Sequence, residues 1–129
     1  MTGKTNLEEI LKTLRPEWHE DEYVFCSFME MPDDASEAIM WFRETEGITL
    51  IVRKETADRK KWPYSFVAAW ITLTVNSSLE AVGLTAAFSF ALSGEGISCN
   101  VVAGFYHDHL FVPSGDAARA LHVLQGLSK

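Results

Sequence analysis

Apolar and polar residues alternate strictly along residues 67–76, and this alternation is the clearest local pattern in the chain. A period of two with several β-branched residues predicts a strand with one buried face. Residues 97–105 alternate in the same way and predict a second strand. The buried face of the first strand is expected to consist of four residues: Ala69, Ile71, Leu73 and Val75.

The stretch between these two strands has the pattern of a buried helix. Residues 77–80 read Ser-Ser-Leu-Glu, a capping box in which Ser77 accepts a hydrogen bond from the amide of Glu80. The helix predicted from there ends near residue 93, and it is apolar on nearly every side. Gly83 lies in its first turns, where glycine costs about 1 kcal/mol relative to alanine. We therefore expect a ligand or another backbone to approach closely at Gly83.

The remaining chain divides into shorter elements. After the second strand we expect a turn over residues 106–109, a strand ended by Pro113, and a helix capped by Ser114. Before the first strand we expect a helix that starts at a capping box over residues 5–8 and ends after Arg15, where Pro16 follows. We also expect helices over residues 38–46 and 54–61, strands over residues 22–28 and 48–53, and a connector over residues 18–21.

Residues 67–127 therefore follow the order β-α-β-β-α, which is the ferredoxin-like pattern without its last strand. A strand from the preceding half could complete the sheet. The element order predicts two related halves, residues 1–65 and 66–129.

Composition narrows the function classes. The chain has 129 residues, 47% of them hydrophobic, which is enough for one compact domain or two small halves that share a sheet. The net charge is -7 and no basic run is present, so we expect no nucleic-acid partner. We expect no signal peptide, no membrane span and, because two cysteines (Cys26 and Cys99) form no disulfide framework, a cytoplasmic protein with reduced thiols.

Specific residues add a family resemblance. A strand ending in TVNSSLEAVGLTAAFSFAL, followed by GISCNVVAGFYHDHLFVP, resembles the ACT domain of amino-acid-responsive proteins. EYVFC and FRETEGITLIV in the first half extend the likeness to small stand-alone bacterial proteins with two ACT-like halves, similar to the regulatory region of aspartate kinase. The resemblance implies an α+β fold, a ferredoxin-like ACT sandwich with an antiparallel sheet and helices on one face. Its C-terminal unit would be βαββα, and its N-terminal half a reduced ACT-like unit.

The resemblance also implies a ligand site. In this family small amino acids bind where the strand-to-helix turn meets a neighbouring sheet, often between two ACT units, which implies a homodimer or pairing of the two halves. The residues placed around the ligand are Asn76, Ser77, Ser78, Leu79, Val82, Gly83 and Leu84, with Asn100 and Val101 from the second strand. The alternative for the residue 76–78 turn is a helix cap and nothing more.

Other candidate chemistry is sparse. His107 and His109 have a spacing that can bind a metal on a strand, but a polar hairpin turn is the commoner explanation, and His19 and His122 have no fixed relation to them. We predict a non-catalytic ACT-like regulatory or sensor protein that binds a small amino acid or related metabolite and needs no cofactor or metal. The alternative is an interaction or oligomerisation module without a small-molecule ligand.

Overall fold

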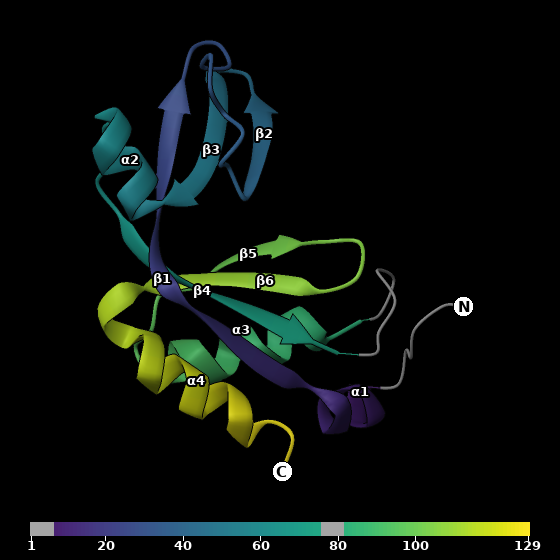
Figure 1. Ribbon diagram of the computed structural model, residues 1–129. Helices are drawn as coiled ribbons and strands as arrows, with labels where there is room; N and C mark the ends of the chain where they lie inside the picture. The colour runs from purple at the N-terminus through teal and green to yellow at the C-terminus, as the bar shows by residue number, and fades with distance from the viewer. Residues whose placement is uncertain (1–6, 76–81) are drawn as a thin grey trace. The chain divides into compact units, whose positions relative to one another are not determined.

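The structure, a computed structural model, describes residues 7–75 and 82–129 (Figure 1). Its contacts divide the chain into two units, and each is described by itself. The larger unit comprises Met1–His19 and Ala69–Lys129, and the smaller unit comprises Glu20–Ala68. Strand β1 (Arg15–Phe28) begins in the larger unit and ends in the smaller one.

The larger unit has the strand order β1-β4-β6-β5. Its helices α3 and α4 lie on the same side of these strands (Figure 1). Strands β5 and β6 pair antiparallel, with Asn100 opposite Phe111 and Val102 opposite His109. The elements of this unit besides β1 are α1 (Leu7–Thr13), β4 (Val67–Thr74), α3 (Leu84–Gly94), β5 (Asn100–Ala103), β6 (Asp108–Pro113), a 3-10 turn (Ser114–Asp116) and α4 (Ala117–Gly126).

The core of the larger unit lies between the strands and the helices. The face of β4 that was expected to be buried lies in this core and packs against Phe88 and Leu92 of α3. The other face of β4 is not simply exposed, because Ala68 and Thr72 are buried too. Ile10 and Leu14, in α1 and at its end, are fully buried in the same cluster. Burial of this many large side chains is what holds α3 in place, because the helix itself carries few polar contacts.

The smaller unit has the strand order β2-β3-β1, with all pairs antiparallel. Strand β2 (Met40–Glu44) pairs with β3 (Gly47–Arg53), which continues directly into helix α2 (Lys54–Lys60). The core under α2 is small and consists of Val24, Cys26, Ile48, Leu50, Val52 and Ala57. The fold is thus α+β and ferredoxin-like with antiparallel strands, as predicted.

The helix predicted over residues 38–46 is wrong, because residues 40–44 form strand β2. A short apolar run has no period long enough to separate helix from strand. Pairing decides here: Trp41 lies opposite Leu50 and Arg43 opposite Ile48. Gly47 allows the chain to reverse between the paired strands, since a Cβ at that position would collide with the carbonyl group of Phe28.

The predicted connector over residues 18–21 is also wrong, because β1 runs without interruption from Arg15 to Phe28. Pro16 is tolerated as the second residue of this strand, at its very beginning. As a result, His19 lies on a strand beside β4 rather than in a loop.

Three boundaries in the second half differ from expectation. Helix α3 begins at Leu84, so Gly83 stands at its N-cap instead of inside its first turns. The hairpin turn comes earlier than predicted, since the amide of Gly104 donates to the carbonyl of His107 at 2.9 Å. Ser114 opens the 3-10 turn, and the N-cap of α4 is Asp116 without a side-chain hydrogen bond. The predicted capping box at residues 77–80 lies outside the described residues.

Candidate functional site

The residues predicted to bind a ligand are only partly described. Asn76, Ser77, Ser78 and Leu79 lie outside the described residues. Of the next three, Val82 is 83% exposed and Leu84 is buried in the core. Gly83 lies between them with a φ of 97°, a left-handed conformation that non-glycine residues rarely adopt. The contact of these residues with a ligand stays a prediction.

Strand β5 places its two predicted ligand residues on opposite faces. Val101 packs against the core cluster of the larger unit, on the side of the helices. Asn100 is exposed and lies opposite Phe111, which is not part of that cluster. Because neighbouring residues of a strand point to opposite faces, Val101 is the one that shares the helix side with Leu84.

The start of α3 is formed by Gly83 and the residues that follow it. Gly83 is its N-cap, and within the part of the chain that the structure describes no side chain caps it. The first turn contains no acidic residue and the last turn no basic one. The first amides of a helix have no intrahelical partner and carry partial positive charge, so this end suits an anion such as a carboxylate. A Cβ placed on Gly83 would lie 3.2 Å from Cδ2 of Leu7, so α1 approaches this end closely.

The face of the larger unit away from the helices carries a polar cluster that we call the histidine–tryptophan cluster: His19, Trp70, Thr72 and His109. The rings of His19 and Trp70 are stacked with centroids 3.7 Å apart. Oγ1 of Thr72 lies 2.7 Å from Nε2 of His19 and 3.1 Å from Nδ1 of His109. Nε1 of Trp70 donates to Nδ1 of His109 at 3.1 Å. The cluster therefore ties β1, β4 and β6 together.

Burial affects both histidines of this cluster. It lowers the pKa of His19, and Glu17 partly offsets this. It also lowers the pKa of His109, as do the neighbouring His107 and His19. The expectation that His19 has no fixed relation to the other histidines was thus wrong, and recognising that β1 extends over residue 19 would have revealed the relation.

The other two members of the predicted His-Asp-His segment lie where the turn meets β6: His107 ends the turn and Asp108 begins the strand. Nδ1 of His107 is buried without a hydrogen-bond partner among the described residues. Burial raises the pKa of Asp108, although His107 partly counteracts it. In the described ranges, no group of three or more histidine, cysteine or acidic side chains is arranged to hold a metal ion.

Both cysteines are free, and neither environment activates a thiol. Burial raises the pKa of Cys26, and it raises the pKa of Cys99 to about 11. Each therefore remains a neutral thiol at pH 7, whereas the reactive nucleophile is the thiolate.

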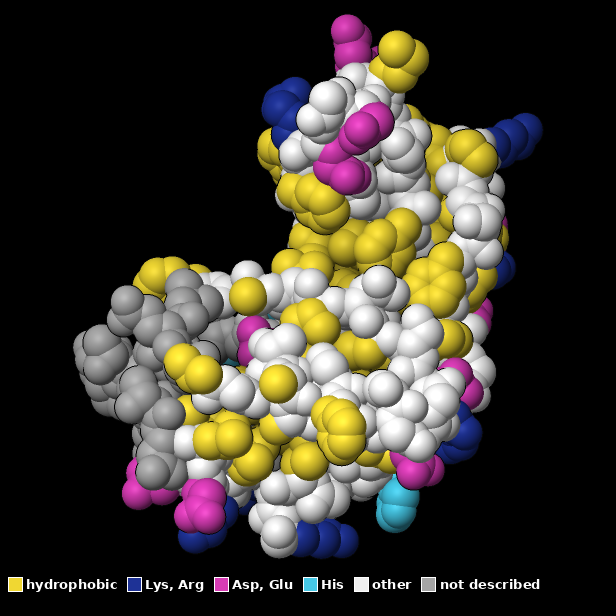
Figure 2. Space-filling model, turned by 180° about the vertical axis from the view of Figure 1, so that it is seen from behind, with side chains coloured by type: hydrophobic (Ala, Val, Ile, Leu, Met, Phe, Trp, Pro, Cys, Tyr) yellow, Lys and Arg dark blue, Asp and Glu magenta, His cyan; other side chains and the backbone are white. Residues whose placement is uncertain are grey.

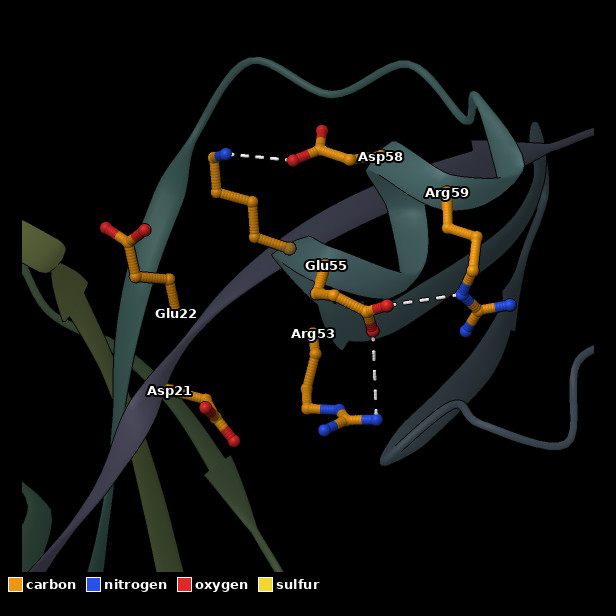
Figure 3. Close-up of a pocket in the computed structure, with 7 residues that line it drawn as sticks. Asp21, Glu22, Arg53, Glu55, Asp58 and Arg59 are labelled. Carbon is orange, nitrogen blue, oxygen red and sulfur yellow. Dashed lines mark hydrogen bonds and ion pairs between the residues drawn. The ribbon is translucent and has the colours of Figure 1, made fainter.

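The smaller unit contains an open cleft of about 720 Å³ beside the start of α2 (Figure 3). Its cations are already paired within the chain. Nζ of Lys54 lies 2.9 Å from Oδ2 of Asp58, and Nε of Arg59 lies 3.2 Å from Oε1 of Glu55. The remaining lining residues are Asp21, Glu22 and Arg53. This exposed ion-pair network is typical of a solvated helix surface.

Several large hydrophobic side chains are exposed, and Figure 2 shows hydrophobic side chains at the surface in several places. On α3 Phe90 is 81% exposed, although Phe88 two residues earlier is fully buried. On the edge strand β2, Trp41 and Phe42 are 51% and 43% exposed. None of the described helices is long and apolar enough to cross a membrane.

Comparison with known families identifies the class of protein. One ACT domain family model matches residues 2–69 and a second matches residues 65–126. The chain therefore belongs to the ACT domain family, as the sequence resemblance predicted. Comparison with curated proteins gives no match.

Solved structures extend this result. A Vibrio cholerae protein of unknown function, described as a possible transport protein, is 44% identical, with a TM-score of 0.87 over 95% of this chain and 96% of that one. An Agrobacterium tumefaciens protein is 20% identical, with a TM-score of 0.61 over 90% of each chain. The ligand-free regulatory subunit of aspartate kinase from Thermus thermophilus is 10% identical, with a TM-score of 0.61 over 88% of this chain and 97% of that one. The last two likenesses concern the fold alone.

Proposed function

We propose that this protein is a non-catalytic ACT-type sensor that binds a small amino acid or related metabolite at the start of α3. The observation that carries the proposal is the N-terminus of that helix, which the described residues leave without a side-chain cap, in a chain of the ACT family. We also keep residues 1–65 and 66–129 as the proposed halves, and a cytoplasmic location as an expectation.

The chemistry of this end favours a carboxylate. The amides of Leu84 and the next two residues have no earlier carbonyl in the helix to donate to, whereas the amide of Ala87 donates to the carbonyl of Gly83 at 2.9 Å. No acidic side chain of the first turn neutralises the positive helix end. An amino acid can supply that negative charge, while Asn76, Ser77 and Ser78 remain the predicted contacts to the rest of the ligand.

The test is calorimetric titration with the common amino acids and with amines that lack the carboxylate. We expect one or two amino acids to bind and their decarboxylated analogues to bind at least tenfold more weakly, because the helix end recognises the carboxylate. Equal binding of the analogue, or no binding by any amino acid, contradicts the proposal.

A charge variant locates the site. Val82→Glu places a carboxylate beside the start of α3 at an exposed position, so it should weaken amino-acid binding by about threefold to tenfold without unfolding the chain. Phe90→Glu is the matched control, since Phe90 is similarly exposed but lies beyond the first turn of the same helix. Equal effects of the two variants would place the ligand elsewhere.

A second candidate function is self-association through β2, and the exposed aromatic residues of that strand favour it. Strand β2 ends the strand order of the smaller unit, and it contains neither proline nor lysine, which commonly protect an edge. A homodimer that pairs this edge would cover Trp41 and Phe42.

Light scattering at several protein concentrations tests this second function. Phe42→Lys on β2 should convert the dimer into a monomer. Phe90→Lys is the control on helix α3 of the larger unit, and should leave the mass of the dimer unchanged. A wild-type protein that remains monomeric at high concentration rules the homodimer out.

A further inference from the structure

The histidine–tryptophan cluster belongs to neither proposed function, and its donors and acceptors determine a protonation state. An indole N–H can only donate a hydrogen bond, so Nδ1 of His109 must accept from Trp70. An imidazole nitrogen that accepts carries no proton. The geometry therefore assigns His109 as a neutral ring with its proton on Nε2.

Thr72 connects this ring to a second histidine. Its single hydroxyl proton can be donated to His19, at 2.7 Å, or toward Nδ1 of His109, at 3.1 Å. When His19 is protonated, its Nε2–H must donate to Thr72, whose hydroxyl then turns toward His109. His19 can thus accept a proton within the cluster. Protonation of His109 at Nδ1 instead removes its contact with Trp70 and reverses its bond with Thr72, whose hydroxyl oxygen would then accept.

The other charged and titratable groups around the two rings have opposing effects. On β1, Glu17 favours the charged form of His19. Next to β6, His107 disfavours a charge on His109, as does His19 itself. The neighbouring Asp108 is half-buried, and its pKa is raised by that burial.

The His109 ring also contacts the hairpin turn. A Cβ placed on Gly104 would lie 3.2 Å from Nε2 and 3.3 Å from Cδ2 of this ring, and 2.9 Å from the carbonyl oxygen of His107. The ring therefore lies against the turn that Gly104 and His107 close. This turn connects β6 to the preceding strand β5, which carries Asn100 and Val101, two of the predicted ligand residues.

We propose that His109 is a pH-sensitive latch, which ties β4 to β6 by accepting the Trp70 indole N–H while neutral and releases that indole when protonated. A protonated His109 would present an N–H to the indole N–H, and two donors cannot bond to each other. Burial and the two neighbouring histidines keep the pKa of His109 below its ordinary 6.5, so the latch is closed at neutral pH. It opens as the pH falls below that value.

Nuclear magnetic resonance of the full chain tests the latch directly, without any substitution. At pH 7.5 we expect the nitrogen shifts of His109 to show a neutral ring protonated at Nε2. On acidification, the indole N–H resonance of Trp70 should move with the same midpoint as His109, below pH 6.5. A ring protonated at Nδ1, or an indole resonance that does not follow the His109 titration, overturns the proposal.

A variant separates the latch from simple burial. Trp70→Phe removes the donor that favours the neutral ring, so the midpoint of His109 should rise by about 0.4 to 1 pH unit. His122→Gln, at an exposed position on α4, is the control and should leave that midpoint unchanged. An unchanged midpoint in a folded Trp70→Phe protein overturns the role of the indole, and if this variant unfolds, the wild-type titration still decides the question.

Discussion

The two units place a helix after a strand in chemically different ways. In the smaller unit, β3 continues directly into α2, whose charged side chains are paired with one another and with Glu37. In the larger unit, α3 follows a left-handed glycine and has no acidic residue in its first turn. The charges at α2 are thus neutralised within the chain, whereas the first turn of α3 contains no acidic side chain that would offset its dipole. This difference is why we place the proposed ligand at α3 and interpret the cleft beside α2 as a solvated surface.

The largest expected effect tests how α3 is held. Phe88→Ala should lower the free energy of unfolding by about 3–5 kcal/mol, because Phe88 is fully buried in the core of the larger unit. Phe90→Ala on the same helix should change it by less than about 0.5 kcal/mol. Urea denaturation of both variants measures the two values. A large cost for Phe90→Ala would mean that the outer face of α3 is covered by a partner.

The next effect concerns the glycine that starts α3. Gly83→Ala should destabilise the protein by about 1–2 kcal/mol, because φ is 97° and Leu7 would have to shift. Gly94→Ala in the same helix meets no atom within 4 Å, and it should be neutral or stabilise by up to about 1 kcal/mol. Thermal unfolding distinguishes the two signs. A neutral Gly83→Ala would contradict the left-handed N-cap.

At the end of α2, in the smaller unit, introducing a glycine is expected to stabilise the protein, whereas removing Gly83 is expected to destabilise it. Lys61, the C-cap of α2, has a φ of 59°, a left-handed conformation that glycine adopts without strain. Lys61→Gly should therefore stabilise the protein by up to about 1 kcal/mol, whereas Lys60→Gly inside the helix should destabilise it. Urea denaturation provides the measurement. Destabilisation by Lys61→Gly would show that the lysine side chain matters more than its backbone conformation.

The smallest effects are electrostatic, and they differ in pH range between the units. Burial lowers the pKa values of His19 and His109 in the folded protein. The two neutral histidines therefore contribute fully to the free energy of unfolding above the ordinary pKa of 6.5, and this contribution is lost as the pH falls below it. In the smaller unit, the hydrogen bond from Lys60 lowers the pKa of Asp34 to about 2. The ionised Asp34 therefore contributes to stability above its ordinary pKa of 3.8, and this contribution is lost only below that pH. At pH 5 to 6 only the larger unit should weaken.

Hydrogen exchange resolved by residue, corrected for intrinsic rates, measures this difference between pH 7.5 and 5. Salt provides the complementary control, because it should screen the exposed ion pairs of α2 and leave the histidine–tryptophan cluster unaffected. Equal loss of protection in both units at pH 5 would show that the histidines are not the cause.

Sequence patterns predicted much of the fold, and the candidate ligand site stays a prediction. The alternation of residues 67–75, the buried helix face with Phe88 and Leu92, and the family resemblance led to the correct fold class. The start of α3 was placed too early, because a capping-box pattern is local and says nothing of where a glycine must turn the chain. The two predicted ligand residues of β5, Asn100 and Val101, lie on opposite faces of that strand, and their contact with a ligand stays a prediction.

The sequence by itself determined the buried apolar face of each long element and whether that element repeats like a strand or a helix. The reason is that the spacing of apolar residues along the chain is a local property. Tertiary structure alone decided that residues 40–44 form a strand, since that run is too short to specify its own conformation and takes it from pairing with β3. It also brought His19, fifty-three residues from Thr72 in the chain, within hydrogen-bonding distance of it. Such a contact depends on strand order, and no local pattern contains the strand order.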